Sequence, residues 1–564
     1  MNKSLNSERL GVLLDCSRNA VMRPEKIKYF IDCIQKMGYN MPELYTEDTL
    51  EIEGEPYFGY MRGRYTVEEI RDLDEYASAR GVELVPCVQT LAHFTNIVRH
   101  SAYEDIVDFG DILLIDEQKT YDLIESIFKT LQKAYTSRIV NIGMDEAHMV
   151  GLGKYLDKHG YHERFSLLLK HLERVVEIAK KYGFTPHMWS DMFFRLASKE
   201  KYEAENSVFR YPDGVPELAG KGYYVDTPLE FKKELLDKIP QGVQLVYWDY
   251  YNFDEKIYDA MFSSHKGFCR ELWFAGGAWN WSGFAPHNGY SVAAMKVAIK
   301  NSVKHGVKNT LITTWGDDGG ECSAFSVLPS LFAISRYKAG VFDEAVIEKE
   351  FFQTFGISFA DMMKLDIPND CGKEIYGKNG YPYLQNPAKS LLYNDPFLGR
   401  MDYAVKTNRS IPYGRYKAEL SDAKKRAGEF GYLFNTLEKL CAVLEIKAEL
   451  GVKTREAYKA ADRKELEKLA RAFDECEKRL DEFIDAYYEQ WIKENKLFGW
   501  EVQDIRLGGL KRRLALCKSR LKAYVDEKIN KIEELEEELL PENESGNFYC
   551  NRYLLIASHS ALGD

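Results

Sequence analysis

The fold is decided by the stretch Ile139-Val140-Asn141-Ile142-Gly143-Met144-Asp145-Glu146, an apolar run that ends in two adjacent acids. A short apolar run bounded by polar residues is typical of a buried strand. Because an unpartnered buried carboxylate is costly, two acids directly after such a strand indicate a site rather than a structural accident. Asp-Glu also occurs at residues 74, 116, 254, 343, 474, 481 and 526, in polar or helical settings where solvated charge is the default.

Seven further apolar runs alternate with helix-length amphipathic segments up to about residue 340. Strands that alternate with helices imply parallel βαβ units, and eight of them predict a closed (β/α)8 TIM barrel of the α/β class. The expected strands are Leu10–Cys16, Tyr39–Tyr45, Glu83–Gln89, Ile139–Asp145, Thr185–Asp191, Gln244–Tyr250, Glu271–Ala278 and Thr310–Asp317. The expected helices between them include Pro24–Met37, Val67–Arg80, Tyr121–Ala134, Glu163–Lys181 and Val292–Lys304.

Most of the expected strands end in polar or aromatic side chains. In a barrel of this type the C-terminal strand ends form the mouth that holds the active site. A doubly wound sheet would gather such groups at a single switch point, so the pattern favours the barrel. The strand-end groups are Asp15, Tyr45, Gln89, Asp145-Glu146, Asp191, Tyr247-Asp249 and Trp315-Asp317.

The pattern changes to helices after about residue 400. Between Leu466 and Tyr487 apolar residues recur at steps of three and four, which predicts one helical face. Further helices are expected at Tyr416–Leu450 and Val502–Leu539. We expect a catalytic barrel over 1–345, a connecting segment over 346–410 and an α-helical domain over 411–564. That domain either packs on the barrel or a partner chain, or forms a wall of the active site.

Composition narrows the partners. A formal net charge of −12 argues against nucleic acid, which needs clustered Lys and Arg, and favours a neutral substrate. The chain starts without a signal-peptide pattern, and no apolar run reaches the roughly 20 residues that span a bilayer. Ten scattered cysteines without a CxxC pair argue against a zinc site and a disulfide framework. We expect a reduced, cytoplasmic protein.

At this point a family resemblance becomes visible. Residues 141–146 resemble the His-x-Gly-Gly-Asp-Glu signature of family 20 β-N-acetylhexosaminidases. Five more segments are similar to the family in the same chain order, over about residues 9–340. They are Leu14–Arg18 (first strand with its arginine), Gly81–Pro86 with His93 (third strand and histidine loop), Trp189-Ser190-Asp191, Tyr247-Trp248-Asp249 (Tyr-x-Asp) and Trp315-Gly316-Asp317 (Trp-x-acid).

The chain also departs from the family pattern. Asn141 stands where the family has His, and Met144 where it has Gly. The loop Gln89-Thr90-Leu91-Ala92-His93 replaces Asp-Thr-Pro-Gly-His. Because Arg18 lies so near the start, we expect the family's common N-terminal domain to be missing. A divergent subgroup is implied.

The resemblance implies a retaining exo-β-N-acetylhexosaminidase that acts on terminal β-linked GlcNAc or GalNAc by substrate assistance, through an oxazoline-type intermediate. Glu146 would protonate the leaving oxygen, Asp145 would accept the acetamide N–H, and Tyr247 would orient the acetamide oxygen. The binding residues implied are Arg18 with Asp249 and Asp317 for hydroxyls, His93, and the walls Trp189, Trp279 and Trp315. Trp281 rivals Trp279, and Glu321 rivals Asp317.

Two other functions stay open. His93 and His148 with Asp145 could form a metal-dependent barrel hydrolase, although no HxH or HExxH spacing occurs. The same aromatic wall would also suit a non-catalytic carbohydrate-binding barrel. We expect no cofactor, no metal, no nucleic acid and no membrane, and a small carbohydrate or glycan as substrate. The oligomeric state is open, with a homodimer through the helical region as one option.

Overall fold

The computed structural model describes residues 8–197, 224–229, 237–267, 269, 271–370, 386–402, 411–540, 552–558, 560 and 562. Within these residues eight parallel strands close into a barrel in which chain neighbours pair, as the alternating pattern predicts. The strands are β1 (Leu10–Asp15), β2 (Met41–Tyr45), β3 (Val85–Cys87), β6 (Ile139–Asn141), β7 (Thr185–Trp189), β8 (Gln244–Trp248), β9 (Leu272–Gly277) and β10 (Asn309–Thr314). A separate antiparallel hairpin consists of β4 (Val107–Phe109) and β5 (Ile112–Leu113).

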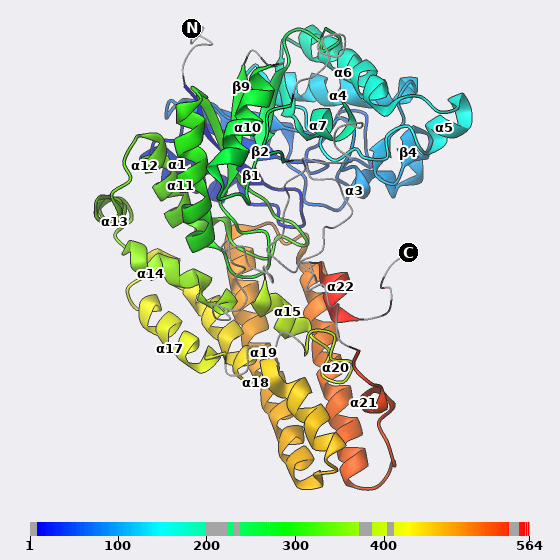
Figure 1. The fold of residues 1–564 in the computed structure, drawn as a ribbon, viewed down its shortest axis with the longest axis vertical. Coiled ribbons are helices and arrows are strands. Elements are labelled where there is room, and N and C mark those ends of the chain that lie inside the picture. Colours follow the sequence, from blue (N-terminus) through cyan, green and yellow to red (C-terminus); the bar gives the residue numbers. More distant parts are fainter. Residues whose placement is uncertain are drawn as a thin grey trace.

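Helices surround the barrel (Figure 1). Their ends follow ordinary capping chemistry. At the start of the helix Val67–Ser78, the Thr66 hydroxyl accepts the Glu69 N–H, and the Glu69 carboxylate accepts the Thr66 N–H. The helices are α1 (Pro24–Met37), α2 (Val67–Ser78), α3 (Thr95–Val98), α4 (Gln118–Ala134), α5 (Lys154–His159), α6 (Arg164–Lys181), α7 (Asp191–Ala197), α10 (Glu255–Lys266), α11 (Asn288–Lys304) and α12 (Leu328–Lys338).

The helices after α12 form the helical region, a bundle that extends away from the barrel (Figure 1). The single helix expected over Tyr416–Leu450 is wrong: a break at 425–430, where Gly428 has a φ of 53°, divides it in two. The expected helix Val502–Leu539 also ends early, at Val525. The helices are α13 (Glu344–Phe355), α14 (Phe359–Met363), α15 (Pro387–Tyr393), α17 (Tyr413–Lys424), α18 (Gly431–Lys459), α19 (Arg463–Glu494), α20 (Trp500–Val525), α21 (Glu533–Glu536) and α22 (Tyr553–Ala557).

The apolar face predicted on α19 packs against the barrel. The rings of Phe483 and Tyr487 lie 5.3 and 5.5 Å from the ring of Phe284, in the segment between β9 and α11. One continuous buried cluster therefore includes residues of both regions. The domain boundaries at 345 and 410 stay predictions. Among the described residues, no helix combines the length and apolarity that crossing a membrane requires.

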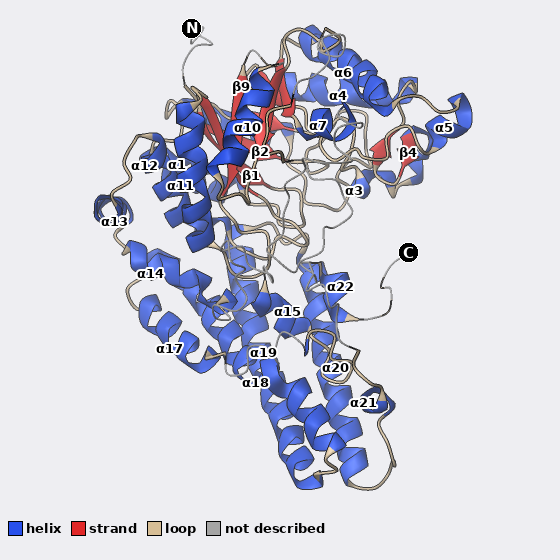
Figure 2. Cartoon of the chain, viewed as in Figure 1, coloured by secondary structure: helices blue, strands red, loops and turns tan. Residues whose placement is uncertain are grey.

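Strand alternation divides the barrel side chains into two layers. Val246 and Leu311 belong to a separate cluster inside the barrel, whereas Tyr247 and Ile312 belong to the large cluster that includes the surrounding helices. The C-terminal ends of the strands lead into loops that lie between the barrel and the helical region (Figure 2). This alternation decides which strand-end residues reach the mouth.

Candidate active site

The acidic pair lies on an abrupt turn after β6. The strand ends at Asn141, before the expected end at Asp145, and Gly143, Met144 and Glu146 then have φ values of 68°, 67° and 54°. A Cβ on Gly143 would lie 2.0 Å from the Gln89 side-chain oxygen, so glycine is required there. Left-handed backbone at Met144 and Glu146 is strained, and such strain gathers at functional sites. Because of this turn, both acids lie beside His93.

Asp145 is held from two sides. Gln89 Nε2 donates to Asp145 Oδ1 at 2.9 Å, and His93 Nε2 lies 3.2 Å from Asp145 Oδ2. Burial alone would raise the pKa of Asp145, but the charge and hydrogen bond of His93, with the Gln89 bond, lower it overall. Burial likewise opposes protonation of His93, yet Asp145 raises the His93 pKa to about 10. Near neutral pH the two form an ion pair.

Glu146 has different surroundings. Its side chain is 49% exposed, and its carboxylate lies 3.9 Å from His93 Nε2. The Glu146 backbone N–H donates to Asp191 Oδ2 at 3.2 Å, and that buried carboxylate pairs with Arg195. Burial raises the pKa of Asp191 to about 7, against the opposing charge of Arg195. The pair thus consists of one enclosed carboxylate and one carboxyl that faces solvent.

Arg18 and Asp317, both expected to bind sugar hydroxyls, contact each other at the mouth. Arg18 Nη1 donates to Asp317 Oδ1 at 2.5 Å, and Arg18 Nε donates to Glu47 Oε1 at 3.0 Å. Partial burial raises the pKa of Asp317 to about 6, although the Arg18 charge lowers it. The sequence reasoning did not identify Glu47 as a site residue. The one signal for it is its position two residues after Tyr45, at the end of a predicted strand.

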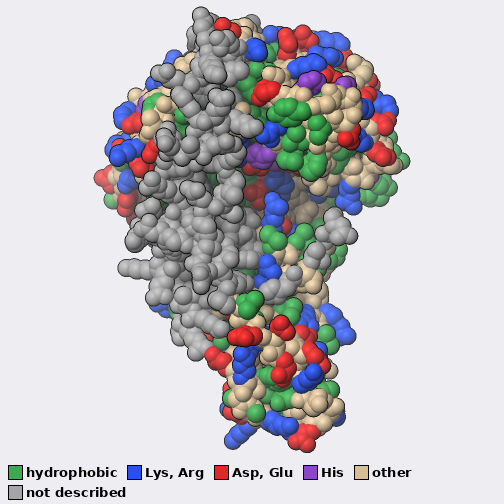
Figure 3. Space-filling model, turned by 45° about the vertical axis from the view of Figure 1, so that its right-hand side comes forward, with side chains coloured by type: hydrophobic (Ala, Val, Ile, Leu, Met, Phe, Trp, Pro, Cys, Tyr) green, Lys and Arg blue, Asp and Glu red, His purple; other side chains and the backbone are tan. Residues whose placement is uncertain are grey.

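A continuous set of hydrogen bonds joins Arg18 to the acidic pair. The Tyr45 hydroxyl donates to Glu47 Oε1 at 2.7 Å and accepts from Gln89 Nε2 at 3.0 Å. Since Gln89 also donates to Asp145, one chain of hydrogen bonds links Arg18 to Asp145. Figure 3 shows acidic, basic and histidine side chains gathered in a hollow between the barrel and the helical region.

Beneath the acids, Glu43 is fully buried inside the barrel. Asn141 Nδ2 donates to Glu43 Oε2 at 3.2 Å, and His187 Nε2 lies 2.9 Å from Glu43 Oε1. Asn141, which departs from the family pattern, therefore serves here as a partner of a buried glutamate.

Two of the predicted tryptophans line the mouth together. The ring of Trp315 lies 5.8 Å from that of Trp189 and 5.1 Å from that of Tyr45. The indole N–H of the buried Trp189 has no hydrogen-bond partner among the described residues. These rings form a wall beside the polar groups.

The structure does not bring Tyr247 and Asp249 to this group. The Tyr247 ring packs at 5.2 and 5.6 Å from the rings of Phe262 and Phe274, on the helix side of β8. Its hydroxyl donates to Asp249 Oδ2 at 2.8 Å, and Asp249 Oδ1 accepts the backbone N–H of Tyr251. Burial raises the pKa of Asp249 to about 6. Both residues hold the turn after β8, because the inward positions of this strand belong to the even-numbered residues.

Trp279 and Glu321 also lie outside the group. Trp279 is fully buried, its indole N–H donates to the Tyr250 carbonyl at 3.0 Å, and its ring packs on Trp281 and Tyr290. Glu321 is buried in an ion cluster with side chains of the helical region. Of the two rivals, Asp317 is the acid that faces Arg18.

Tyr250 is a mouth residue that the sequence reasoning missed. Its ring stacks on that of Trp248 at 5.3 Å. Trp248 packs against the cluster inside the barrel, and Tyr250 follows it by two residues, just past the end of β8. Burial raises the pKa of Tyr250; hydrogen bonds to Trp315 and Thr313 oppose the rise, and the charges of Asp145 and Asp317 add to it. The hydroxyl of Tyr250 therefore lies within electrostatic reach of the acids.

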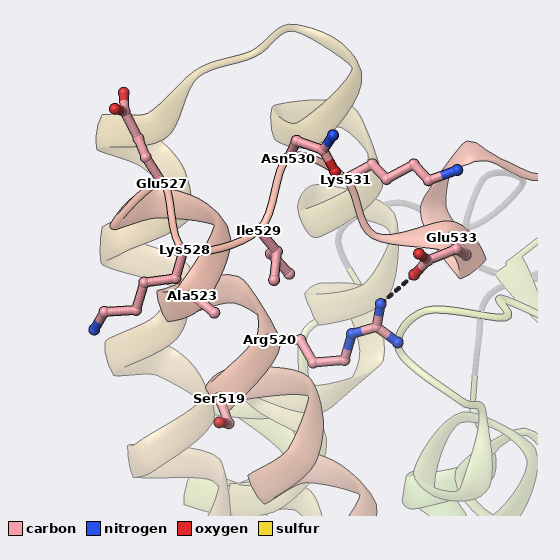
Figure 4. Close-up of a pocket in the computed structure, with 9 residues that line it drawn as sticks. All are labelled: Ser519, Arg520, Ala523, Glu527, Lys528, Ile529, Asn530, Lys531 and Glu533. Atoms are coloured by element: carbon pink, nitrogen blue, oxygen red, sulfur yellow. Dashed lines mark hydrogen bonds and ion pairs between the residues drawn. The ribbon is translucent and has the colours of Figure 1, made fainter.

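The metal-dependent alternative gains no support from the described residues, where no three His, Cys, Asp or Glu side chains are grouped to hold an ion. One open hollow lies at the far end of α20 (Figure 4). Its Arg520 is already paired with Glu533, and the groove lacks the aromatic wall of the barrel mouth.

A closed parallel barrel with a carboxylate pair at its C-terminal mouth defines a TIM-barrel protein of the glycosidase type. The profile described as "Glycosyl hydrolase family 20, catalytic domain" matches residues 10–226, and "Glycoside Hydrolase 20C C-terminal domain" matches residues 361–551. The chain belongs to glycoside hydrolase family 20.

Curated relatives agree with this family at low identity. Hexosaminidase D from Bos taurus is 24% identical over 181 residues, which cover 30% of this chain and 52% of the relative. Hexosaminidase D from Homo sapiens is 24% identical over 181 residues, covering 37% of its length. The matched part of the chain thus spans about half of the length of the first relative and less of the second. A solved family 20 exo-β-N-acetylglucosaminidase from Vibrio harveyi has 13% identity and a TM-score of 0.45, covering 64% of this chain and 59% of that chain.

Proposed function

We propose that the chain is a retaining exo-β-N-acetylhexosaminidase that removes terminal β-linked GlcNAc or GalNAc by substrate assistance. The observation that carries the proposal is that the two adjacent acids have different surroundings. Asp145 is enclosed and ionised between Gln89 and His93, whereas Glu146 faces solvent. Family membership and the name of the curated relatives support the substrate class.

In the proposed mechanism the 2-acetamido oxygen attacks the anomeric carbon while the bond to the leaving oxygen breaks. Glu146 gives its proton to that oxygen. Asp145 accepts the acetamide N–H and stabilises the positive charge that develops there; its carboxylate has about four acceptor sites, so Gln89 and His93 leave room. Water, deprotonated by Glu146, then attacks the anomeric carbon from the face that the leaving group vacated and breaks the oxazoline C–O bond, so the configuration is retained.

Tyr250, in place of Tyr247, is our candidate donor to the acetamide oxygen, because its hydroxyl lies near Trp315 and Thr313 inside the mouth. Arg18 and Asp317 would bind hydroxyls of the terminal sugar, with His93 steadying the acids. Trp189 and Trp315 would cover the apolar face of the ring. Asp249 and Trp279 take structural roles in this proposal.

The test compares aryl β-GlcNAc, aryl β-GalNAc and plain aryl β-glucoside for wild type and Glu146→Gln. We expect hydrolysis of an acetamido sugar, inhibition by a thiazoline mimic of the cyclised intermediate, and a loss of about 10²–10⁴-fold in Glu146→Gln. Equal activity on the plain glucoside would refute substrate assistance. Loss of activity on chelation would favour the metal-dependent hydrolase, and ligand binding without turnover would favour the non-catalytic barrel.

A further inference from the structure

The loop after β10, residues 316–321, carries Asp317 on an unusual backbone. Asp318, Gly319 and Gly320 have φ values of 51°, 119° and 60°. Within the loop the Gly320 N–H donates to the Gly316 carbonyl at 2.7 Å. Consecutive left-handed residues, one of them not glycine, persist only where the surroundings hold them. The loop therefore needs support from outside the barrel.

That support comes from two buried cations of the helical region. Arg506 on α20 donates to the Asp318 carbonyl at 2.7 Å, to Asp318 Oδ1 at 3.0 Å and to Glu321 Oε1 at 3.0 Å. Lys389 on α15 donates to Asp318 Oδ2 at 2.8 Å and lies 2.7 Å from Glu321 Oε2. Two cations thus balance two carboxylates, and each ion is compensated despite its burial.

The same region also touches the segment around Arg18. The Lys496 N–H donates to the Val21 carbonyl at 2.8 Å. A Cβ on Gly499 would lie 2.4 Å from the Asn19 carbonyl, so these backbones are in direct contact. Across the site, a Cβ on Gly320 would lie 2.8 Å from the Arg18 carbonyl. The segments that carry Arg18 and Asp317 are therefore packed against each other and against residues 494–506.

We propose that Arg506 and Lys389 are positioning residues, through which the helical region sets the geometry of the Arg18–Asp317 pair and hence the affinity for the terminal sugar. This inference rests on the proposed function. Arg506 and Lys389 contact Asp318 and Glu321 in the 316–321 loop, and within the described part of the chain neither cation has a hydrogen bond or ion pair to Asp145 or Glu146. Their loss should therefore weaken sugar binding more than chemistry. The helical region is then part of the substrate site in function.

The kinetic test uses Arg506→Gln with Arg513→Gln as the matched control. Arg513 lies on the same helix and binds Asp395 through Nε at 2.6 Å and Nη2 at 3.1 Å, without touching the loop. We expect Arg506→Gln to raise KM for the aryl acetamido sugar about tenfold, with kcat within about threefold, and Arg513→Gln to leave both near wild type. Arg506→Lys should recover part of the loss, because it keeps the charge but not the fork.

The second arm compares the parent sugar with its 4-deoxy and 6-deoxy analogues. If Arg506 acts through Asp317, the increase in KM should be smaller for the analogue that lacks the hydroxyl bound by Asp317, as in a double-mutant cycle. A purely structural defect would raise KM equally for all three sugars and would overturn the proposal. Should Arg506→Gln fail to fold, Gln503→Met removes the milder bond from Gln503 Nε2 to the Gly319 carbonyl, which spans 3.1 Å.

A third arm needs no activity. Amide hydrogen exchange of a peptide covering residues 314–323 should be faster in Arg506→Gln than in wild type, and unchanged in Arg513→Gln. Unchanged exchange together with an unchanged KM would overturn the positioning role while leaving the proposed function intact. If the wild type hydrolyses no acetamido sugar, the proposed function and the claim on sugar affinity are overturned. Faster exchange in Arg506→Gln than in wild type would in that case still show that Arg506 supports the loop.

Discussion

The barrel mouth has two unlike halves. The charged half lies at the ends of β1, β2, β3, β6 and β10. It contains Arg18, Glu47, Gln89, Asp145 and Asp317, each bonded to another member of the set. The aromatic half consists of Trp189 at the end of β7, Tyr250 after β8 and Trp315 after β10. In this half Asp249 only caps the turn that follows β8. A polar residue at a strand end therefore enters the site only where the strand alternation and the following turn face it inward.

The largest expected difference in kcat between the two halves comes from the same substitution, Asp to Asn, made once in each half. Asp145→Asn removes the charge that would stabilise the acetamide and unpairs His93, so kcat on the aryl acetamido sugar should fall about 10²–10³-fold. Asp249→Asn should leave kcat within about threefold, since the hydrogen bonds of that carboxylate within the described part of the chain go to its own turn and to Tyr247. It should instead lower the thermal midpoint, because an amide N–H₂ would face the backbone donors that the carboxylate accepts. Similar kcat losses in both variants would erase the distinction.

A smaller effect is expected from the two tyrosines. Tyr250→Phe should lower kcat about 10²-fold if its hydroxyl binds the acetamide oxygen, which is the lower end of the range for the loss of one donor to developing charge. Tyr247→Phe removes the bond from its hydroxyl to Asp249 and should change kcat less than threefold, at a cost in stability of about 1 kcal/mol. The reverse ranking in steady-state kinetics would restore Tyr247 as the donor and would contradict the inward alternation of β8.

The sequence reasoning succeeded where the evidence was local. Alternating strands and helices predicted the barrel, and the apolar run before Asp145 separated that acidic pair from its seven copies elsewhere. At β8 the letters do not show which residues face inward, and the structure places the Tyr247 ring against Phe262 and Phe274. Gln244–Trp248 is apolar on both faces apart from its first residue, so period-two alternation cannot be read from the letters.

Other parts of the site depend on contacts distant in the chain. Glu47 is recognisable only through its bonds to Arg18 and Tyr45, which require the closed barrel. The contact between Arg506 and Asp318 joins residues separated by 188 positions. The periodic apolar pattern of the C-terminal helices predicts that they pack, but not that a cation from α20 holds the loop beside Asp317. Tertiary geometry supplies this information.

The smallest predicted effect concerns pH and tests whether the charged half also stabilises the fold. The folded pKa of His93 is raised to about 10 from a model-compound value of 6.5, so the stability it contributes is fully present below pH 6.5 and is lost as pH rises through about 10. The pKa of Asp145 is lowered from 3.8, so its contribution is present above pH 3.8 and lost as pH falls further. Between these limits the ion pair stays intact.

Denaturant unfolding at a series of pH values would measure this contribution. The free energy of unfolding should differ between wild type and His93→Gln by about 2 kcal/mol near pH 6, a figure reduced for partial exposure, and the difference should shrink toward pH 10. His171→Gln is the control, since burial lowers the His171 pKa to about 4 and keeps that ring neutral from pH 7 to 10. Its difference from wild type should stay constant over that range. A His93→Gln difference that is equally constant would mean that His93 and Asp145 are not an ion pair, and that the charged half contributes to chemistry without contributing to stability.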